Sequence, residues 1–242
     1  MKLDILIFAA HPDDAELSMG GTIASLTDSG FKVGIVDLTA GELGTRGSKI
    51  IRKQESKIAS EILKVTHREN LSLKDGSIYE DDKIRKLIVQ KIRKFQPVYI
   101  FAPYFNDRHP DHIATSKLVK SAMFFSGVTK YLSNGKNNSN KIIRPLKLFY
   151  YMQSYPFEPS FVIDVTNYFD VKMKSVYAYK TQFYDPASKE PHTFISDPKF
   201  VKYLEDRSRF YGFQIGKEYG EAFFCEELVE FDLINFLKKA KK

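Results

Sequence analysis

The sequence predicts an α/β protein with a doubly wound, mostly parallel sheet flanked by helices. Two observations support this: apolar runs alternate with amphipathic stretches through the first half of the chain, and the links between them are short. Such alternation is typical of parallel strands joined by crossover helices, the Rossmann-like arrangement. With 242 residues, 43% of them hydrophobic, the chain can bury one substantial core. We therefore expect one domain over 1–242, with 1–127 as the doubly wound core and 128–242 as a small α+β extension packed on it.

Four strand–helix pairs are expected in the first half. The expected strands are "LDILIFAA" (3–10), "KVGIVDLT" (32–39), "NLSL" (70–73) and "PVYIFAP" (97–103). The expected helices are "GGTIASLTDSG" (20–30), "SKIIRKQESKIASEILK" (48–64), "EDDKIRKLIVQKIRKF" (80–95) and "DHIATSKLVKSAMFFSG" (111–127). Gly30 and Gly127 are expected to end their helices, and Ser48 is a candidate N-cap.

The second half is less regular. The segment 131–145 is rich in Asn, Ser, Gly and Lys, which indicates a mobile surface loop. Strands are expected near 146–152 and 161–165, and helices near 166–182 and 197–213. This mixture gives the expected α+β extension.

Composition narrows the function classes. Cys225 is the only cysteine, which excludes an intramolecular disulfide and a cysteine-based zinc site. The net charge of +7 includes a lysine-rich tail at 238–242, which we interpret as a solvated end. No nucleic-acid-binding signature is present, so no nucleic-acid partner is expected. The N-terminal apolar run is too short to span a membrane and carries Asp4, so we expect no membrane association and a soluble cytoplasmic protein.

Two related tetrapeptides follow predicted strands, "HPDD" (11–14) and "HPDH" (109–112). Asp13 and Asp14 repel each other, and burying either one unpaired is costly, so an arginine or a metal ion is expected beside them. The motifs hold three of the five histidines in the chain. A catalytic zinc takes three nitrogen or oxygen ligands, which two histidines and one carboxylate would supply. Ligands of doubly wound sheets bind at the carboxyl ends of strands, where both motifs lie.

The remaining side chains of the motifs suit hydrolysis. One of two adjacent aspartates can bind a metal while its neighbour accepts a proton from water. One histidine of "HPDH" can bind the metal while the other stabilises an oxyanion or protonates a leaving amine. Asp111, which lies between them, could orient the free imidazole. The alternative is structural: Asp13 or Asp14 caps a helix, and His109 is an ordinary loop histidine.

These motifs resemble a known family. "AHPDDAE" followed by "GGT", with "RHPDH" about one hundred residues later, is similar to the LmbE/PIG-L family of zinc-dependent sugar N-deacetylases. Within it, the chain resembles the bacillithiol-biosynthesis branch, which removes acetyl from N-acetylglucosaminyl malate. The supporting stretches are "DLTAGELGTRGS" (37–48), "FAPYFNDRHPDH" (101–112), "AYKTQFYDP" (178–186) and "GFQIGKEYGEAF" (212–223).

The resemblance implies a role for each motif residue. It implies one Zn²⁺ per chain, with three ligands: His11, Asp14 and His112. It implies that Asp13 is the general base and that His109 stabilises the intermediate and acts as acid, supported by Asp111. Iron, cobalt or manganese would also fit such a ligand set.

The resemblance also implies contacts with a small anionic glycoside. Arg52 matches an arginine that contacts the sugar, and Arg108 is expected as a second anionic contact. Arg46 could bind a malate carboxylate in the same way or serve only its own "GTRGS" loop. Some relatives carry a mobile tyrosine over the oxyanion; Phe200 aligns nearest to it here, and His192 could approach the site instead.

Alternative functions keep parts of this site. The same metal centre could deacetylate another acetylated glycoside or a chitin oligosaccharide, or cleave an amide of a thiol conjugate. A nucleotide- or sugar-binding module without catalysis is the alternative from another class. The chain lacks the G-x-G-x-x-G loop after its first strand that dinucleotide binding would need. The resemblance also implies a homo-oligomer, either a trimer or a hexamer.

Overall fold

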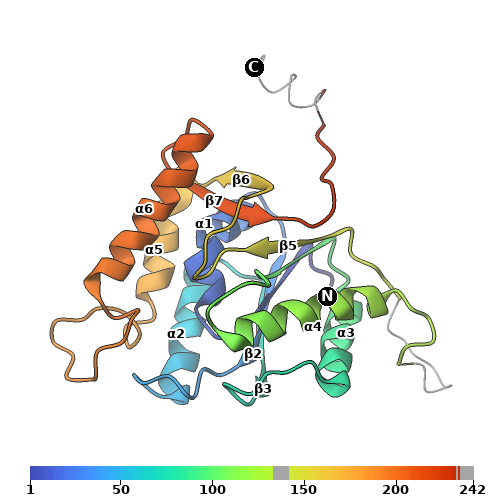
Figure 1. Cartoon of the computed structure of the whole chain (residues 1–242), viewed down its shortest axis with the longest axis horizontal. Helices are drawn as coiled ribbons and strands as arrows, with labels where there is room; N and C mark the ends of the chain where they lie inside the picture. Colours follow the sequence, from blue (N-terminus) through green and yellow to red (C-terminus); the bar gives the residue numbers. More distant parts are fainter. Residues whose placement is uncertain (133–141, 233, 235–242) are drawn as a thin grey trace.

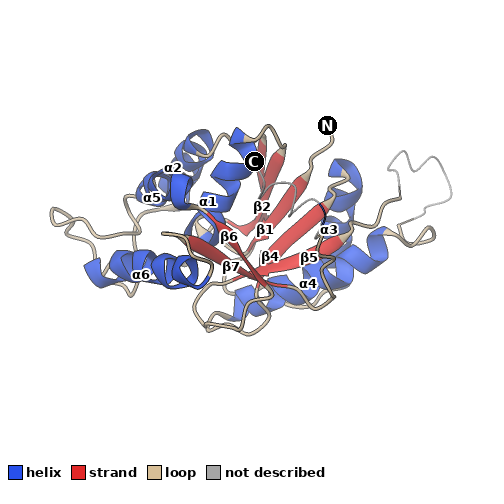
Figure 2. Ribbon diagram, turned by 90° about the horizontal axis from the view of Figure 1, so that it is seen from above, coloured by secondary structure: helices blue, strands red, loops and turns tan. Residues whose placement is uncertain are grey.

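The computed structural model describes residues 1–132, 142–232 and 234, which form a seven-stranded mixed sheet with helices on both faces (Figures 1 and 2). The strands are β1 (Ile5–Ala9), β2 (Val33–Thr39), β3 (His67–Leu73), β4 (Tyr99–Pro103), β5 (Lys147–Tyr151), β6 (Phe161–Asp164) and β7 (Gly220–Phe224). Their order is β3-β2-β1-β4-β5-β7-β6, parallel from β3 to β5, with β7 antiparallel to both of its neighbours. The predicted α/β, mostly parallel architecture is confirmed.

The helices cover the sheet unequally. They are α1 (Asp14–Asp28), α2 (Lys49–Ile62), α3 (Asp82–Phe95), α4 (Pro110–Ser126), the 3₁₀ turn η1 (Thr166–Tyr168), α5 (Phe169–Tyr177) and α6 (Pro198–Gln214). In Figure 2, α3 and α4 lie on one face, while α1, α2 and α5 lie on the other. Helix α6 lies beside β7 and packs on Ala222, which points away from α1. Apolar side chains of β1 therefore alternate between two cores: Leu6 and Phe8 pack with α3 and α4, and Ile5 and Ile7 pack with α1.

Several elements differ from those expected. The first helix begins at Asp14 rather than near residue 20, so that "HPDD" leads directly into it. The expected helix at 166–182 is shortened to the turn η1 and α5. Strand β7 was not predicted, because "GEAFF" is short and carries a charged residue, Glu221. The loop at 131–145 and the tail at 238–242 cannot be compared, since 133–141 and 235–242 lie outside the described residues.

The buried charge of Glu221 is explained by a break in α1. Met19 has non-helical dihedral angles (φ −141°), which frees backbone N–H groups in the middle of the helix. The Glu221 carboxylate accepts hydrogen bonds from the N–H groups of Gly21 and Thr22 at 3.0 and 2.7 Å, and Lys172 pairs with it at 2.6 Å. Tertiary contact, rather than strand propensity, keeps this carboxylate in β7.

The strand order places the two histidine motifs side by side. β1 pairs with β2 on one side and β4 on the other, so the direction of winding reverses between β1 and β4. This switch point is where ligands bind in doubly wound sheets. Among the described residues, no helix has the length and apolarity to cross a membrane.

Candidate active site

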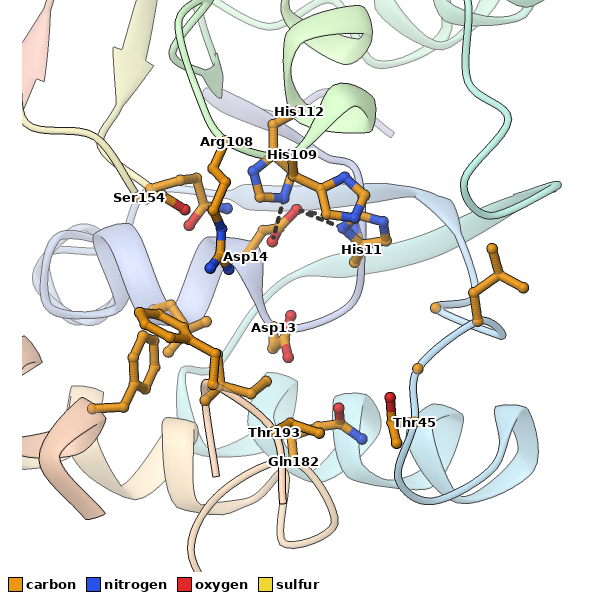
Figure 3. Close-up of a pocket in the computed structure, with 18 of the residues that line it drawn as sticks. His11, Asp13, Asp14, Thr45, Arg108, His109, His112, Ser154, Gln182 and Thr193 are labelled. Atoms are coloured by element: carbon orange, nitrogen blue, oxygen red, sulfur yellow. Dashed lines mark hydrogen bonds and ion pairs between the residues drawn. The ribbon is translucent and has the colours of Figure 1, made fainter. Parts of the chain in front are cut away.

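The two motifs meet where β1 and β4 end (Figure 3). "HPDD" forms the turn between β1 and α1, and "HPDH" forms the start of α4, with Pro110 in the first turn. The ring centroids of His11 and His109 are 4.6 Å apart, and those of His109 and His112 are 5.0 Å apart. Residues separated by nearly one hundred positions are thus in direct contact because their strands are parallel neighbours.

Asp14 lies between the two histidines that were expected to bind metal with it. Its Oδ2 is 3.6 Å from Nδ1 of His11, and its Oδ1 is 3.3 Å from Nε2 of His112. All three side chains are buried. Burial raises the pKa of Asp14, but His112 and His11 outweigh it and hold that pKa well below its usual range. Asp14 is therefore a carboxylate that faces two imidazoles.

The opposite nitrogen of each imidazole is held by another carboxylate. Nε2 of His11 is 3.0 Å from Oδ1 of Asp75, and Nδ1 of His112 is 2.8 Å from Oδ1 of Asp107. A histidine that donates one N–H to a carboxylate presents the other nitrogen as a metal ligand. The arrangement leaves Nδ1 of His11 and Nε2 of His112, the nitrogens that face Asp14, available for a metal.

The donor chemistry fits a divalent metal. Two imidazoles and one carboxylate form a common catalytic zinc set. Two other combinations have ligand atoms within 4.8 Å of one another: His11, His109 and His112, and His11, Asp75 and Asp111. The residues present can therefore hold a zinc ion with two or three imidazoles.

Asp13 occupies a strained position in front of this cluster. It is the N-cap residue of α1, with φ 114°, yet its side chain makes no capping hydrogen bond. Such a conformation is costly for a residue other than glycine and is concentrated at functional sites. Oδ2 of Asp13 accepts a hydrogen bond from Nη2 of Arg52 at 2.7 Å. Burial raises the pKa of Asp13 to about 6, against the lowering effect of the Arg52 guanidinium.

Arg52 holds Asp13 and the preceding backbone together. Its Nε and Nη2 donate to the carbonyl of Pro12, and its Nη1 donates to Oε1 of Gln182 at 2.7 Å. Arg52 lines the cavity in front of the site but is itself buried. Its contact with a sugar stays a prediction, whereas its ion pair with Asp13 explains how one of the two adjacent carboxylates is compensated.

His109 and Asp111 are arranged differently from the expectation. The Asp111 carboxylate does not face the His109 ring: it accepts hydrogen bonds from the N–H groups of Gly76 and Ile78, and it lies 3.5 Å from Nε2 of His11. The link to His109 runs through the Asp111 backbone N–H, which donates to Nδ1 of His109 at 3.2 Å. A neutral His109 therefore carries its proton on Nε2. Burial, followed by the neighbouring His11 and His112, lowers the pKa of His109, which favours this neutral form.

A cavity of about 640 Å³ opens in front of these residues. Its floor includes His11, Asp13, Asp14, His109 and His112, and its walls come from four segments: 41–45, 153–155, 193–195 and α6. Arg108 is exposed at this cavity, with its guanidinium carbon 4.5 Å from the centre of the Phe194 ring. The volume is sufficient for a small glycoside.

Of the remaining candidate residues Arg46, Phe200 and His192, only Phe200 lines the cavity. Arg46 is buried outside the cavity lining, where its guanidinium donates to the Phe183 carbonyl and to Oγ of Ser188. This geometry agrees with the loop role for Arg46 rather than with a substrate contact. Phe200 lines the cavity, whereas His192 is exposed and does not.

Sequence reasoning missed Asp75 and Asp107 as partners of the histidines. Asp107 lies two residues before His109, within "NDRHPDH", so its proximity was a usable signal. Asp75 follows β3 at the same edge of the sheet, and only the strand order brings it to His11.

Comparison with known proteins supports a shared ancestry. Residues 6–123 match the PIG-L family model, described as GlcNAc-PI de-N-acetylase. A diacetylchitobiose deacetylase from Thermococcus kodakarensis is 29% identical over 231 residues, which cover 90% of this chain and 80% of that protein. A probable N-acetyl-alpha-D-glucosaminyl L-malate deacetylase 2 from Bacillus cereus is 26% identical over 198 residues, covering 75% and 84%.

A solved structure extends the match to nearly the whole chain. The crystal structure of a conserved protein from Thermus thermophilus has a TM-score of 0.85 and 35% sequence identity, covering 96% of this chain and 98% of that one. With both histidine motifs inside the matched family region, the chain belongs to the PIG-L/LmbE family of deacetylases.

Proposed function

We propose that this chain is a zinc-dependent hydrolase that removes the acetyl group from an N-acetylglucosaminide. The proposal rests on the imidazoles of His11 and His112. Each ring faces Asp14 with one nitrogen and a second buried carboxylate with the other. Asp13 and His109 lie beside them on the floor of the cavity. His11, Asp14 and His112 would hold the ion. When bound, zinc polarises a carbonyl and makes water acidic enough to attack at neutral pH.

The chain's own residues supply the proton transfers. Arg52 occupies Oδ2 of Asp13, and in the described part of the chain Oδ1 makes no hydrogen bond. Asp13 accepts a proton from the attacking water as the new C–O bond forms. His109 donates from Nε2 to the carbonyl oxygen, which becomes negative at this stage. The C–N bond then breaks as the proton held by Asp13 passes to the amine nitrogen, which gives acetate and a glucosamine.

Our first candidate substrate is N-acetylglucosaminyl L-malate. The Bacillus cereus relative is named for this substrate, and Arg108 presents an exposed guanidinium at the cavity. A guanidinium suits bidentate recognition of a carboxylate, of which malate has two. This assignment would place the chain in bacillithiol synthesis.

The second candidate is an uncharged disaccharide such as diacetylchitobiose. The Thermococcus relative is named for it, and one wall of the cavity is aromatic, with Phe194 and Tyr203 both partly exposed. Aromatic faces and the apolar face of a sugar ring bury surface together. The two candidates differ in charge, so a direct comparison separates them.

The deciding experiment measures release of a primary amine from both compounds. It compares the native chain, the chain stripped by a chelator, and the stripped chain resupplied with zinc. We expect loss on stripping and recovery with zinc, with the malate compound as the preferred substrate. Activity that survives complete removal of metal contradicts the metal-dependent mechanism, and preference for diacetylchitobiose replaces the first candidate with the second.

A further inference from the structure

Two buried carboxylates outside the predicted ligand set make matching contacts on opposite sides of the site. Asp107 follows β4, and Asp75 follows β3. Each is about 5% exposed. Neither faces the metal-binding nitrogens, so the proposed chemistry leaves both without a role.

Asp107 joins one ligand histidine to one wall of the cavity. Its Oδ1 accepts from Nδ1 of His112 at 2.8 Å and from the His109 N–H at 2.9 Å. Its Oδ2 accepts from the N–H of Ser154 at 2.8 Å. Ser154 belongs to the segment after β5 that lines the cavity.

Asp75 repeats the pattern on the other side. Its Oδ1 is 3.0 Å from Nε2 of His11, and its Oδ2 accepts from the N–H of Leu43 at 2.9 Å. Leu43 belongs to the loop after β2 that lines the cavity.

We propose that Asp107 and Asp75 are positioning residues that each fix the ring of a metal-ligating histidine with one oxygen and hold a substrate-lining loop with the other. The inference rests on the metal site of the proposed function. It adds that these carboxylates link the retention of the metal to the conformational stability of the segments around Ser154 and Leu43. A ligand imidazole needs its second N–H accepted, or the wrong ring nitrogen carries the proton.

Asparagine is the informative substitution, because it keeps the shape but only one of the two acceptors. In Asp107→Asn, the amide oxygen can accept from His112 or from Ser154, while the NH₂ group faces the other donor. The same holds for Asp75→Asn, except that Asp111 lies 3.5 Å from Nε2 of His11 and can accept its proton. The effect of Asp107→Asn should therefore be the larger one.

The first measurement is the zinc affinity of the metal-free full chain, determined by competition with a chromophoric chelator. We expect Asp107→Asn to weaken zinc binding about 10–100-fold and Asp75→Asn less. The control is Glu55→Gln, a buried carboxylate that holds a segment through the N–H and hydroxyl of Thr181. No hydrogen bond between Glu55 and a histidine occurs in the described chain, so its zinc affinity should equal that of the native protein.

The second measurement is amide hydrogen exchange in the same samples. Asp107→Asn should speed exchange in the segment around Ser154, and Asp75→Asn in the segment around Leu43, each without the other. A merely structural role would instead loosen the fold without this division. The visible spectrum of the cobalt-substituted chain adds a readout of ligand geometry that is independent of turnover.

The outcomes separate the inference from the proposed function. If the native chain binds zinc and both variants bind it equally well while remaining folded, the inference is wrong and the metal site stands. If the native chain takes up no zinc, the metal site itself is wrong. If Asp107→Asn does not fold, Asp75→Asn and its own loop decide the question.

Discussion

The segment after β1 and the segment after β4 carry almost the same four residues, yet they present them differently. In "HPDD", the N-cap residue Asp13 has a left-handed backbone and no capping hydrogen bond, so its carboxylate is free to meet Arg52. In "HPDH", the N-cap residue His109 accepts the Asp111 N–H in a regular helix start. In "HPDD", a strained backbone leaves the Asp13 carboxylate without a capping role. In "HPDH", Nδ1 of His109 accepts a hydrogen bond, and Nε2 remains available at the cavity.

This contrast teaches that helix starts serve two purposes at one site. A capping side chain has its own donor or acceptor engaged, which fixes its orientation. A side chain that does not cap must be compensated elsewhere, and for Asp13 the buried guanidinium of Arg52 does so. The following predictions test whether Asp13 acts as the base and His109 stabilises the oxyanion.

The largest effect on activity is expected from replacing Asp13, the proposed base. Asp13→Asn removes the proton acceptor and should lower kcat about 10²–10⁴-fold. Zinc content should stay at the native level, since Asp14 and the two histidines are unchanged. The measurement is amine release together with metal analysis; a variant with more than a tenth of native kcat would remove Asp13 from the role of base.

The next largest effect on activity is expected from replacing His109. His109→Ala removes the Nε2–H donor and should lower kcat about 10²–10³-fold, with zinc retained. His192→Ala, at an exposed histidine outside the cavity lining, is the matched control and should behave as native. Loss of zinc from the His109 variant would instead make His109 a ligand, in line with the close cluster of three imidazoles.

A smaller effect, on stability, is expected from replacing Arg52, the cation that pairs with the buried Asp13 carboxylate. Arg52→Lys keeps the charge but cannot reach Asp13, Pro12 and Gln182 together, so buried acceptors lose donors. We expect a loss of about 1–3 kcal/mol in the free energy of unfolding, measured by urea denaturation. Arg108→Lys, at an exposed residue, should change it by less than about 0.5 kcal/mol. Equal losses would show that burial does not distinguish the two arginines.

The smallest effect concerns the substrate. Arg108→Gln should raise KM for N-acetylglucosaminyl malate about fivefold, in keeping with about 1 kcal/mol for an exposed ionic contact. KM for diacetylchitobiose should not change, because that compound carries no carboxylate. Steady-state kinetics with both compounds provide the test, and an equal change for both would assign Arg108 to the sugar rather than to the aglycone.

Local patterns in the sequence determined the alternation of strands and helices and the two histidine motifs. The buried strands β1 and β4 are continuous apolar runs, and β2 is an apolar run interrupted by Asp37. Such runs depend only on neighbours along the chain. The motifs could be located for the same reason, since "HPDD" follows the first run and "HPDH" follows "YFNDR" (104–108) after β4. Which aspartate is expected to bind metal came from the family resemblance, because two adjacent carboxylates are locally equivalent.

Only the tertiary structure decided which groups face one another across the site. Asp75 reaches His11, and Arg46 is engaged by the segment around Ser188, through contacts that are set by strand order and loop packing. Likewise, Glu221 remains in β7 because a break in α1 offers it two N–H groups. Periodicity describes which side of an element is apolar, whereas the pairing of buried polar groups depends on where distant segments meet.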